Sequence, residues 1–254
     1  MKRIPTIGLG TWKSPRSKDL INAIVYAVQE AGYAHIDCAS CYKNEDIVGQ
    51  AFEKLFTSGV KREQLWITSK LWNTHHRPEY VESACKHTLK LLKIDKLDLY
   101  LMHYPTAFKA DGPEGEYFPT DEKGQFIFDR EVSFIDTYKE MEKLVEKGLT
   151  RHIGVSNFTI NQLERLKNSG IKIKPYTNQV EFHLYMQQKP MRNYLHDEGI
   201  LLTGFSTLGS ADFAKPNQPV LLKDEVLLKI AEETGRTAGE VALKFLNTIE
   251  PSAA

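Results

Sequence analysis

Ala34-His35-Ile36-Asp37-Cys38-Ala39-Ser40-Cys41-Tyr42 is the stretch of sequence that decides the fold. Its first half predicts a buried strand over residues 34–38 that carries a carboxylate, and Tyr42 follows on the next loop, just before a predicted helix. Two later predicted strands end on Lys70 and on His103. The carboxyl ends of the strands form the active-site face of a βα barrel. The sequence therefore predicts that Asp37, Tyr42, Lys70 and His103 meet in one pocket.

Outward from this stretch, the apolar residues alternate between strand and helix spacing. Short apolar runs predict strands over residues 7–12, 34–38, 65–69, 97–101, 152–155, 177–180 and 201–205, and a helical pattern follows each of them. Parallel neighbours need crossover connections, so this alternation predicts a parallel sheet. Residues 105–132 interrupt the pattern, and a connection of that length predicts a functional loop over the pocket.

The run Gly8-Leu9-Gly10-Thr11-Trp12-Lys13 bears on the choice between an open doubly wound sheet and a closed barrel. It follows a predicted strand and precedes a helix, as a dinucleotide-binding fingerprint does. It lacks the third glycine, and no acidic residue closes a second strand at the expected interval. We therefore predict an α/β fold in which the parallel strands close into a barrel. Since no linker or charge run divides the chain, residues 1–254 are expected to form a single domain.

Composition narrows the class of partner. The chain has 254 residues, 41% of them hydrophobic, and its 33 basic residues balance 33 acidic ones, so neither nucleic acid nor an anionic membrane is expected as a partner. A small molecule is the expected ligand, and the protein is expected to be a monomer. Three cysteines favour a reducing compartment, and the first residues lack the apolar core of a signal peptide. These features predict a cytoplasmic protein.

The four strand-end side chains suit the protonation of an alkoxide as it forms. A phenol with a pKa of about 10 is a poor proton donor at neutral pH, but a nearby ammonium stabilises the phenolate, so Lys70 is expected to lower the pKa of Tyr42. Asp37 is expected to hold Lys70 by an ion pair, and His103 to donate a hydrogen bond to a carbonyl oxygen. Such a set fits carbonyl reduction by hydride. None of these groups can deliver hydride, so a nicotinamide must supply it.

Six motifs between residues 4 and 245 resemble those of aldo-keto reductases, most closely the aldose reductase and aldehyde reductase branch. The resemblance implies a (β/α)8 barrel and NADPH-dependent reduction of aldehydes, such as sugars or lipid-derived aldehydes, to alcohols. It also implies that Tyr42 is the proton donor. The motifs are Gly8-Leu9-Gly10-Thr11-Trp12, His35-Ile36-Asp37-Cys38-Ala39 with Tyr42 and Asn44-Glu45, Ser69-Lys70-Leu71-Trp72-Asn73, Met102-His103-Tyr104-Pro105-Thr106, Ile153-Gly154-Val155-Ser156-Asn157-Phe158 and Thr177-Asn178-Gln179-Val180-Glu181.

The same resemblance implies which residues contact the cofactor and the substrate. The nicotinamide carboxamide would be held by Ser156, Asn157 and Gln179, and its ring would stack on Phe205, where the family usually has tyrosine. Residues matching the loop over the pyrophosphate are Ser206, Leu208, Ser210 and Asp212, and further cofactor contacts fall on Gly10, Thr11, Trp12 and Asp37. The substrate pocket would be lined by Trp12, Trp72, His103 and Tyr104, the last in a place where aldose reductases carry tryptophan.

The end of the sequence departs from the family pattern and leaves alternatives open. After Leu246 the family continues into an eighth strand, a segment that grips the 2'-phosphate of NADP, a last helix and a substrate loop, whereas only residues 247–254 follow here. The barrel is therefore expected to be truncated before its eighth strand, and the chain could instead be a catalytically weak nucleotide-binding or regulatory barrel, or an inactive isoform.

Cys38 and Cys41 have the spacing of a redox or zinc pair. Cys85 is the only other thiol, so no metal site is expected.

Overall fold

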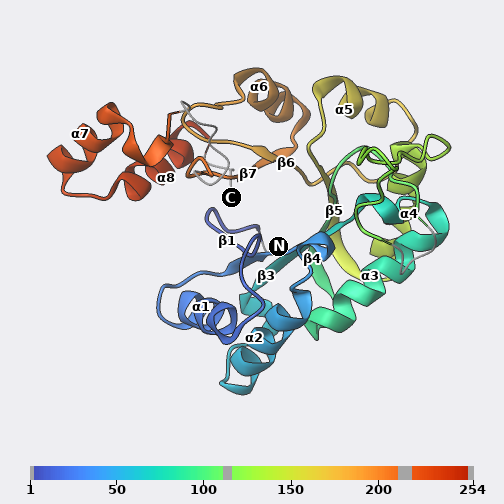
Figure 1. Cartoon of the computed structure of the whole chain (residues 1–254), viewed down its shortest axis with the longest axis horizontal. Coiled ribbons are helices and arrows are strands. Elements are labelled where there is room, and N and C mark those ends of the chain that lie inside the picture. Colours follow the sequence, from blue (N-terminus) through green and yellow to red (C-terminus); the bar gives the residue numbers. More distant parts are fainter. Residues whose placement is uncertain (1–2, 111–115, 211–218, 251–254) are drawn as a thin grey trace. The chain divides into compact units, whose positions relative to one another are not determined.

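A computed structural model of the chain describes residues 3–110, 116–210 and 219–250 (Figure 1). The chain divides into two compact units, Met1–Tyr176 and Thr177–Ala254. The single domain expected over residues 1–254 stays a prediction. Within the described residues, no helix is both long enough and apolar enough to cross a membrane.

The first unit contains five parallel strands that pair in the order of the sequence. They are β1 (Leu9–Gly10), β2 (His35–Asp37), β3 (Trp66–Leu71), β4 (Leu97–Met102) and β5 (Thr150–Ser156). Every residue of β3 and β4 is buried, as expected of parallel strands covered on both faces. A doubly wound sheet would place later strands on the far side of β1. The sequential order therefore confirms the barrel-type winding rather than the dinucleotide-binding alternative.

Helices connect these strands, as the sequence pattern predicts. They are α1 (Lys18–Gln29), α2 (Glu45–Thr57), α3 (Pro78–Leu92), α4 (Phe134–Glu146) and α5 (Ile160–Lys167), with short 3-10 turns η1 (Ser40–Tyr42), η2 (Arg62–Gln64) and η3 (Asn73–His75). In this series α1 packs against α2, α2 against α3 and α3 against α4 (Figure 1). Thr159 and Gln162 form the expected capping box at the start of α5.

The second unit carries the remaining elements described by the structure. Strands β6 (Thr177–Glu181) and β7 (Leu201–Phe205) pair in parallel on either side of α6 (Lys189–Glu198) in the sequence. The turn η5 (Leu221–Lys223), α7 (Glu225–Thr234) and α8 (Ala238–Ile249) share a small core of Leu221, Leu227 and Ala242. Thr237 and Glu240 form the second expected capping box, at the start of α8.

The first strand is shorter than the sequence pattern suggests. The apolar run over residues 7–12 predicts six strand residues, whereas β1 covers only Leu9–Gly10. Thr11 still bonds to the next strand, because its backbone N–H and its hydroxyl both donate to the carbonyl of Asp37, at 3.0 and 2.9 Å. Lys13 then adopts a left-handed backbone with φ of 57°, which ends the extended run and starts a turn.

The close approach of α2 to α3 gives a stability prediction. A Cβ added at Gly49 would lie 2.1 Å from the carbonyl oxygen of Leu91, which is backbone and cannot move aside. We expect Gly49→Ala to lower the free energy of unfolding by about 1–3 kcal/mol. In α8, Gly239→Ala is the matched control, since its Cβ would meet only Leu208 at 3.9 Å. Urea unfolding followed by circular dichroism checks both; a Gly49→Ala protein as stable as Gly239→Ala would contradict the packing.

Candidate active site

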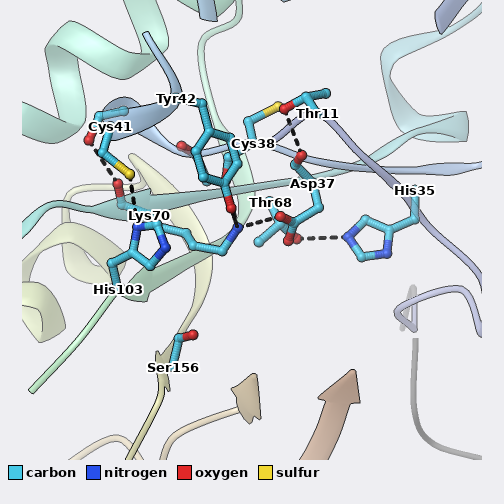
Figure 2. Close-up of polar contacts among 12 residues, drawn as sticks. Thr11, His35, Asp37, Cys38, Cys41, Tyr42, Thr68, Lys70, His103 and Ser156 are labelled. Carbon is cyan, nitrogen blue, oxygen red and sulfur yellow. Dashed lines mark hydrogen bonds and ion pairs between the residues drawn. The ribbon is translucent and has the colours of Figure 1, made fainter. Parts of the chain in front are cut away.

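A buried lysine is the centre of the site (Figure 2). Lys70 lies on β3 and is fully buried. Its ammonium forms a short ion pair with the carboxylate of Asp37 and donates to the carbonyl of Cys38 at 2.9 Å and to the phenol oxygen of Tyr42 at 3.2 Å. The three donors of the ammonium therefore have three oxygen partners. The strand-end lysine and carboxylate and the loop phenol are thus brought together, as the sequence predicts.

The loop that presents Tyr42 is held at several points. It forms the 3-10 turn η1 between β2 and α2. The Ser40 hydroxyl donates to the carbonyl of Lys70 at 3.2 Å, and the buried side chain of Asn44 donates to the carbonyl of Thr11 at 2.9 Å. These bonds fasten the loop to β3 and to the end of β1, so the phenol has a fixed position relative to the lysine.

His103 follows β4 and completes the group. Its ring lies edge-on to the ring of Tyr42, with centroids 5.8 Å apart, and its Nδ1 is 3.5 Å from the thiol of Cys41. The side-chain amide of Asn157 donates to the carbonyl of His103 at 2.9 Å. Burial, together with the positive charge of Lys70 and the neighbouring His76, lowers the pKa of His103 well below its ordinary value. The imidazole is therefore neutral near pH 7 and has one N–H to donate.

The pKa of Tyr42 depends on burial as well as on the neighbouring charges. Burial raises the pKa of the phenol, the charge of Lys70 lowers it, and the charge of Asp37 raises it again; the net pKa lies above its ordinary value. Lys70 therefore lowers the pKa of Tyr42, as the sequence predicts, but burial outweighs it. The pattern of residues indicates the charges and does not indicate the loss of solvent. The phenol is therefore protonated throughout the neutral range.

The pKa of Lys70 shows the opposite balance. Burial alone lowers this pKa, but the charges of Asp37 and Tyr42 and the hydrogen bonds to both raise it, and the net pKa lies above its ordinary value. The lysine is a stable ammonium. An ammonium can only donate hydrogen bonds, so Tyr42 accepts in its bond with Lys70. The proton of the phenol is consequently left to point elsewhere.

Aromatic side chains lie beside His103. The ring of Trp72 is 5.1 Å from that of His103 and 5.2 Å from that of Phe118. The rings of Tyr104 and Phe108 also pack edge-on against Trp72, at 6.1 and 5.9 Å. We call Trp72, Tyr104, Phe108 and Phe118 the aromatic wall. Its members come from the end of β3 and from the long connection after β4.

Comparisons with known proteins show the family of the chain. The sequence model of the aldo/keto reductase family matches residues 6–249. The chain belongs to the aldo/keto reductase family. It is 42% identical to aldo-keto reductase family 1 member A1 of Xenopus tropicalis over 248 residues, covering 96% of this chain and 74% of that protein. It is 42% identical to aldo-keto reductase family 1 member C3 of Homo sapiens over 250 residues, covering 95% and 76%.

A solved structure extends the match to three dimensions. The aldose reductase of Schistosoma japonicum aligns with a TM-score of 0.90 at 40% identity, over 100% of this chain and 79% of that one. These matches confirm the (β/α)8 barrel class and the resemblance to the aldose reductase branch. This aldo/keto reductase is therefore an oxidoreductase of a family that reduces carbonyl groups with a nicotinamide nucleotide.

The first unit of this aldo/keto reductase offers several of the expected nucleotide contacts. A Cβ added at Gly10 would meet no protein atom within 4 Å, so the backbone there is open to close approach by a ligand. Trp12 is 49% exposed, whereas Thr11 is fully buried and bonded to Asp37, which makes it a support of the strand end. Ser156 is buried at the end of β5 and accepts a hydrogen bond from Asn157 at 3.1 Å. The open backbone and these polar strand ends fit a bound nucleotide.

The other expected contacts lie in the second unit. Gln179 is a buried residue of β6, and Phe205 ends β7 half-buried. Ser206 has a left-handed backbone with φ of 53°, and its hydroxyl accepts from Ser210 at 2.7 Å, while Leu208 is 38% exposed. Asp212 lies outside the described residues. Their assignment to the nucleotide stays a prediction.

The expected substrate contacts of this reductase differ in exposure. Trp72 is only 6% exposed, and its indole N–H donates to the carbonyl of Tyr117 at 2.6 Å. Tyr104 is 40% exposed and stacks on His103, with ring centroids 5.3 Å apart. The long connection over residues 105–132 thus contacts Trp72 through the carbonyl of Tyr117 and the ring of Phe118. Sequence reasoning did not single out these two residues. The density of aromatic residues between positions 104 and 128 was the available signal.

Sequence reasoning also gave no role to Glu45, a fully buried carboxyl group behind Lys70. It accepts hydrogen bonds from the hydroxyls of Ser69 at 2.6 Å and Thr88 at 3.1 Å, and burial raises its pKa to about 7. Cys41 is a free thiol whose pKa burial raises to about 12, which argues against a thiolate redox centre. Among the described residues, no cluster of histidine, cysteine and acidic side chains could hold a metal ion.

Proposed function

We propose that this enzyme reduces aldehydes to primary alcohols with NADPH, which supplies the hydride when bound, while Tyr42 supplies the proton. The observation that carries the proposal is the line from Asp37 through Lys70 to the oxygen of Tyr42, with the ring edge of His103 beside it. The four side chains that the sequence singles out, three at strand ends and one on a loop, therefore lie close together.

The hydrogen bond from Lys70 determines where the hydroxyl proton of Tyr42 can point. Because Lys70 donates to the phenol oxygen, the O–H of Tyr42 is free to donate to a carbonyl oxygen placed between Tyr42 and His103. The raised pKa of Tyr42 keeps that proton in place until an alkoxide forms, and an alkoxide is a much stronger base than a phenolate. After transfer, the ammonium of Lys70 stabilises the phenolate at 3.2 Å.

His103 and Asp37 act in support. The neutral imidazole can give its N–H to the carbonyl oxygen and so polarise the carbon, provided that the proton sits on Nε2 rather than Nδ1. Asp37 fixes the lysine and balances its charge, so that the buried ammonium is tolerated. The aromatic wall keeps water from the reacting carbon.

Two linked measurements test the proposal. Addition of NADPH should quench the tryptophan fluorescence of the protein, and a further addition of an aldehyde should produce an enzyme-dependent fall in the absorbance of the reduced nicotinamide. Binding without turnover would instead support a nucleotide-binding barrel without reductase activity. Failure of both signals, with a folded protein by circular dichroism, would overturn the proposal.

A further inference from the structure

Lys43 follows Tyr42 directly and has a fixed backbone. It adopts a left-handed conformation with φ of 55° at the end of η1. The guanidinium of Arg16 donates to the carbonyl of Lys43 and pairs with both carboxylate oxygens of Asp46 at 2.7 Å. The side chain of Lys43 therefore starts from a defined point at the edge of the site.

The ammonium of Lys43 lies over aromatic rings. Its nitrogen is 5.2 Å from the ring centroid of Tyr117 and 5.9 Å from that of Phe118, both within the range of a cation–π contact. No carboxylate in the described part of the chain forms an ion pair with it. Some surface lysines do have such a partner: Lys93 pairs with Glu53 at 2.6 Å and Lys143 with Glu140 at 2.6 Å. Among the residues that the structure describes, the charge of Lys43 is thus not paired with an acidic side chain.

The aromatic wall connects this charge to the reacting groups. Phe118, which lies under the ammonium, is 5.2 Å from Trp72, and Trp72 is 5.1 Å from His103. Two rings therefore separate the imidazole from the cation. An aldehyde whose oxygen lies at His103 and whose apolar body lies along Trp72 and Phe118 would bring its far end toward Lys43.

We infer that Lys43 selects aldehydes that carry an anionic group, such as a carboxylate, at the end remote from the carbonyl. This inference rests on the proposed reductase function and names the substrate class of the same site. An exposed ammonium and a carboxylate attract each other weakly, so the selection should be about two- to tenfold in KM. Lys43 does not contact the reacting carbon in this arrangement, so kcat should change little.

A matched substrate pair tests the inference. The enzyme is assayed at saturating NADPH with para-carboxybenzaldehyde and with its methyl ester, which has the same aromatic body but no charge. The quantity compared is kcat/KM for the acid divided by kcat/KM for the ester, and we expect it to exceed one in the wild type. It should fall about two- to tenfold in Lys43→Met and further in Lys43→Glu. Lys43→Arg should keep the ratio. Lys54→Met, on the exposed end of α2, is the control and should also keep it.

Two more readouts separate the possible outcomes. About 0.5 M salt should reduce the preference of the wild type for the acid, because screening weakens exposed charge pairs. The affinity for NADPH, measured by fluorescence quenching, should be equal in wild type and Lys43→Met. If both aldehydes are reduced but Lys43→Met leaves their ratio unchanged, or weakens NADPH binding and both aldehydes alike, the inference fails while the reductase function stands. If neither aldehyde is reduced, the proposed function itself fails.

Discussion

Tyr42→Phe is expected to lower kcat for aldehyde reduction by about two to four orders of magnitude, the usual contribution of a general acid. The substitution removes one hydroxyl, which accepts from Lys70 at 3.2 Å and carries the proton that we assign to the product oxygen. The ring and its edge-on packing against His103 remain. The fold and the affinity for NADPH should therefore be preserved. Steady-state kinetics and fluorescence titration with NADPH measure the two quantities separately.

The control for this variant is Tyr26→Phe. Tyr26 lies on α1 and is 66% exposed, so loss of its hydroxyl should change neither kcat nor NADPH binding. A Tyr42→Phe enzyme with the kcat of the wild type would rule out Tyr42 as the proton donor. A variant that loses nucleotide affinity together with turnover would instead make Tyr42 part of the binding site.

Lys70→Met should damage both activity and stability. Without the ammonium, the phenolate of Tyr42 loses its stabilising charge, and the carboxylate of Asp37, with a side chain only 16% exposed, loses its partner. Breaking a buried ion pair from one side costs about 3–5 kcal/mol, and the partial exposure of Asp37 places this case near the lower figure. Urea unfolding measures the loss of stability, and the aldehyde assay measures the loss of turnover.

The double variant Asp37→Asn with Lys70→Met separates the two effects. Removal of the unpaired carboxylate should restore part of the stability, whereas turnover should stay low because the ammonium is still missing. Lys93→Met removes a surface pair with Glu53 and should cost less than about 1 kcal/mol. Equal losses in Lys70→Met and Lys93→Met would show that the buried pair does not stabilise the fold.

The parts of the site that depend on strand position were predictable from the sequence. Asp37, Lys70 and His103 stand at the ends of three consecutive strands whose apolar runs are easy to recognise, and parallel pairing brings such ends together. The capping boxes at α5 and α8 were predictable for a similar reason, since each uses residues three positions apart. Sequence spacing therefore predicts the strand-end residues and the capping boxes, because the positions of both follow from the regular geometry of the backbone.

Other features depend on tertiary packing and leave no regular pattern. The pKa of Tyr42 is set mainly by burial, which the sequence does not show. Phe118 reaches Trp72 from an irregular connection, where neither helical nor strand spacing indicates which side chains turn inward. Nothing in the sequence distinguishes Lys43 from the other lysines, whereas the structure places its ammonium over the ring of Tyr117.

The bond from the indole of Trp72 to the backbone of Tyr117 has a consequence for how such an enzyme can diversify. A backbone carbonyl is present whatever side chain stands at position 117, so the indole keeps its anchor while neighbouring positions change identity. New preferences among carbonyl substrates can therefore arise by exchange of residues along this one connection. The groups that we propose transfer the proton belong to other elements and need not change.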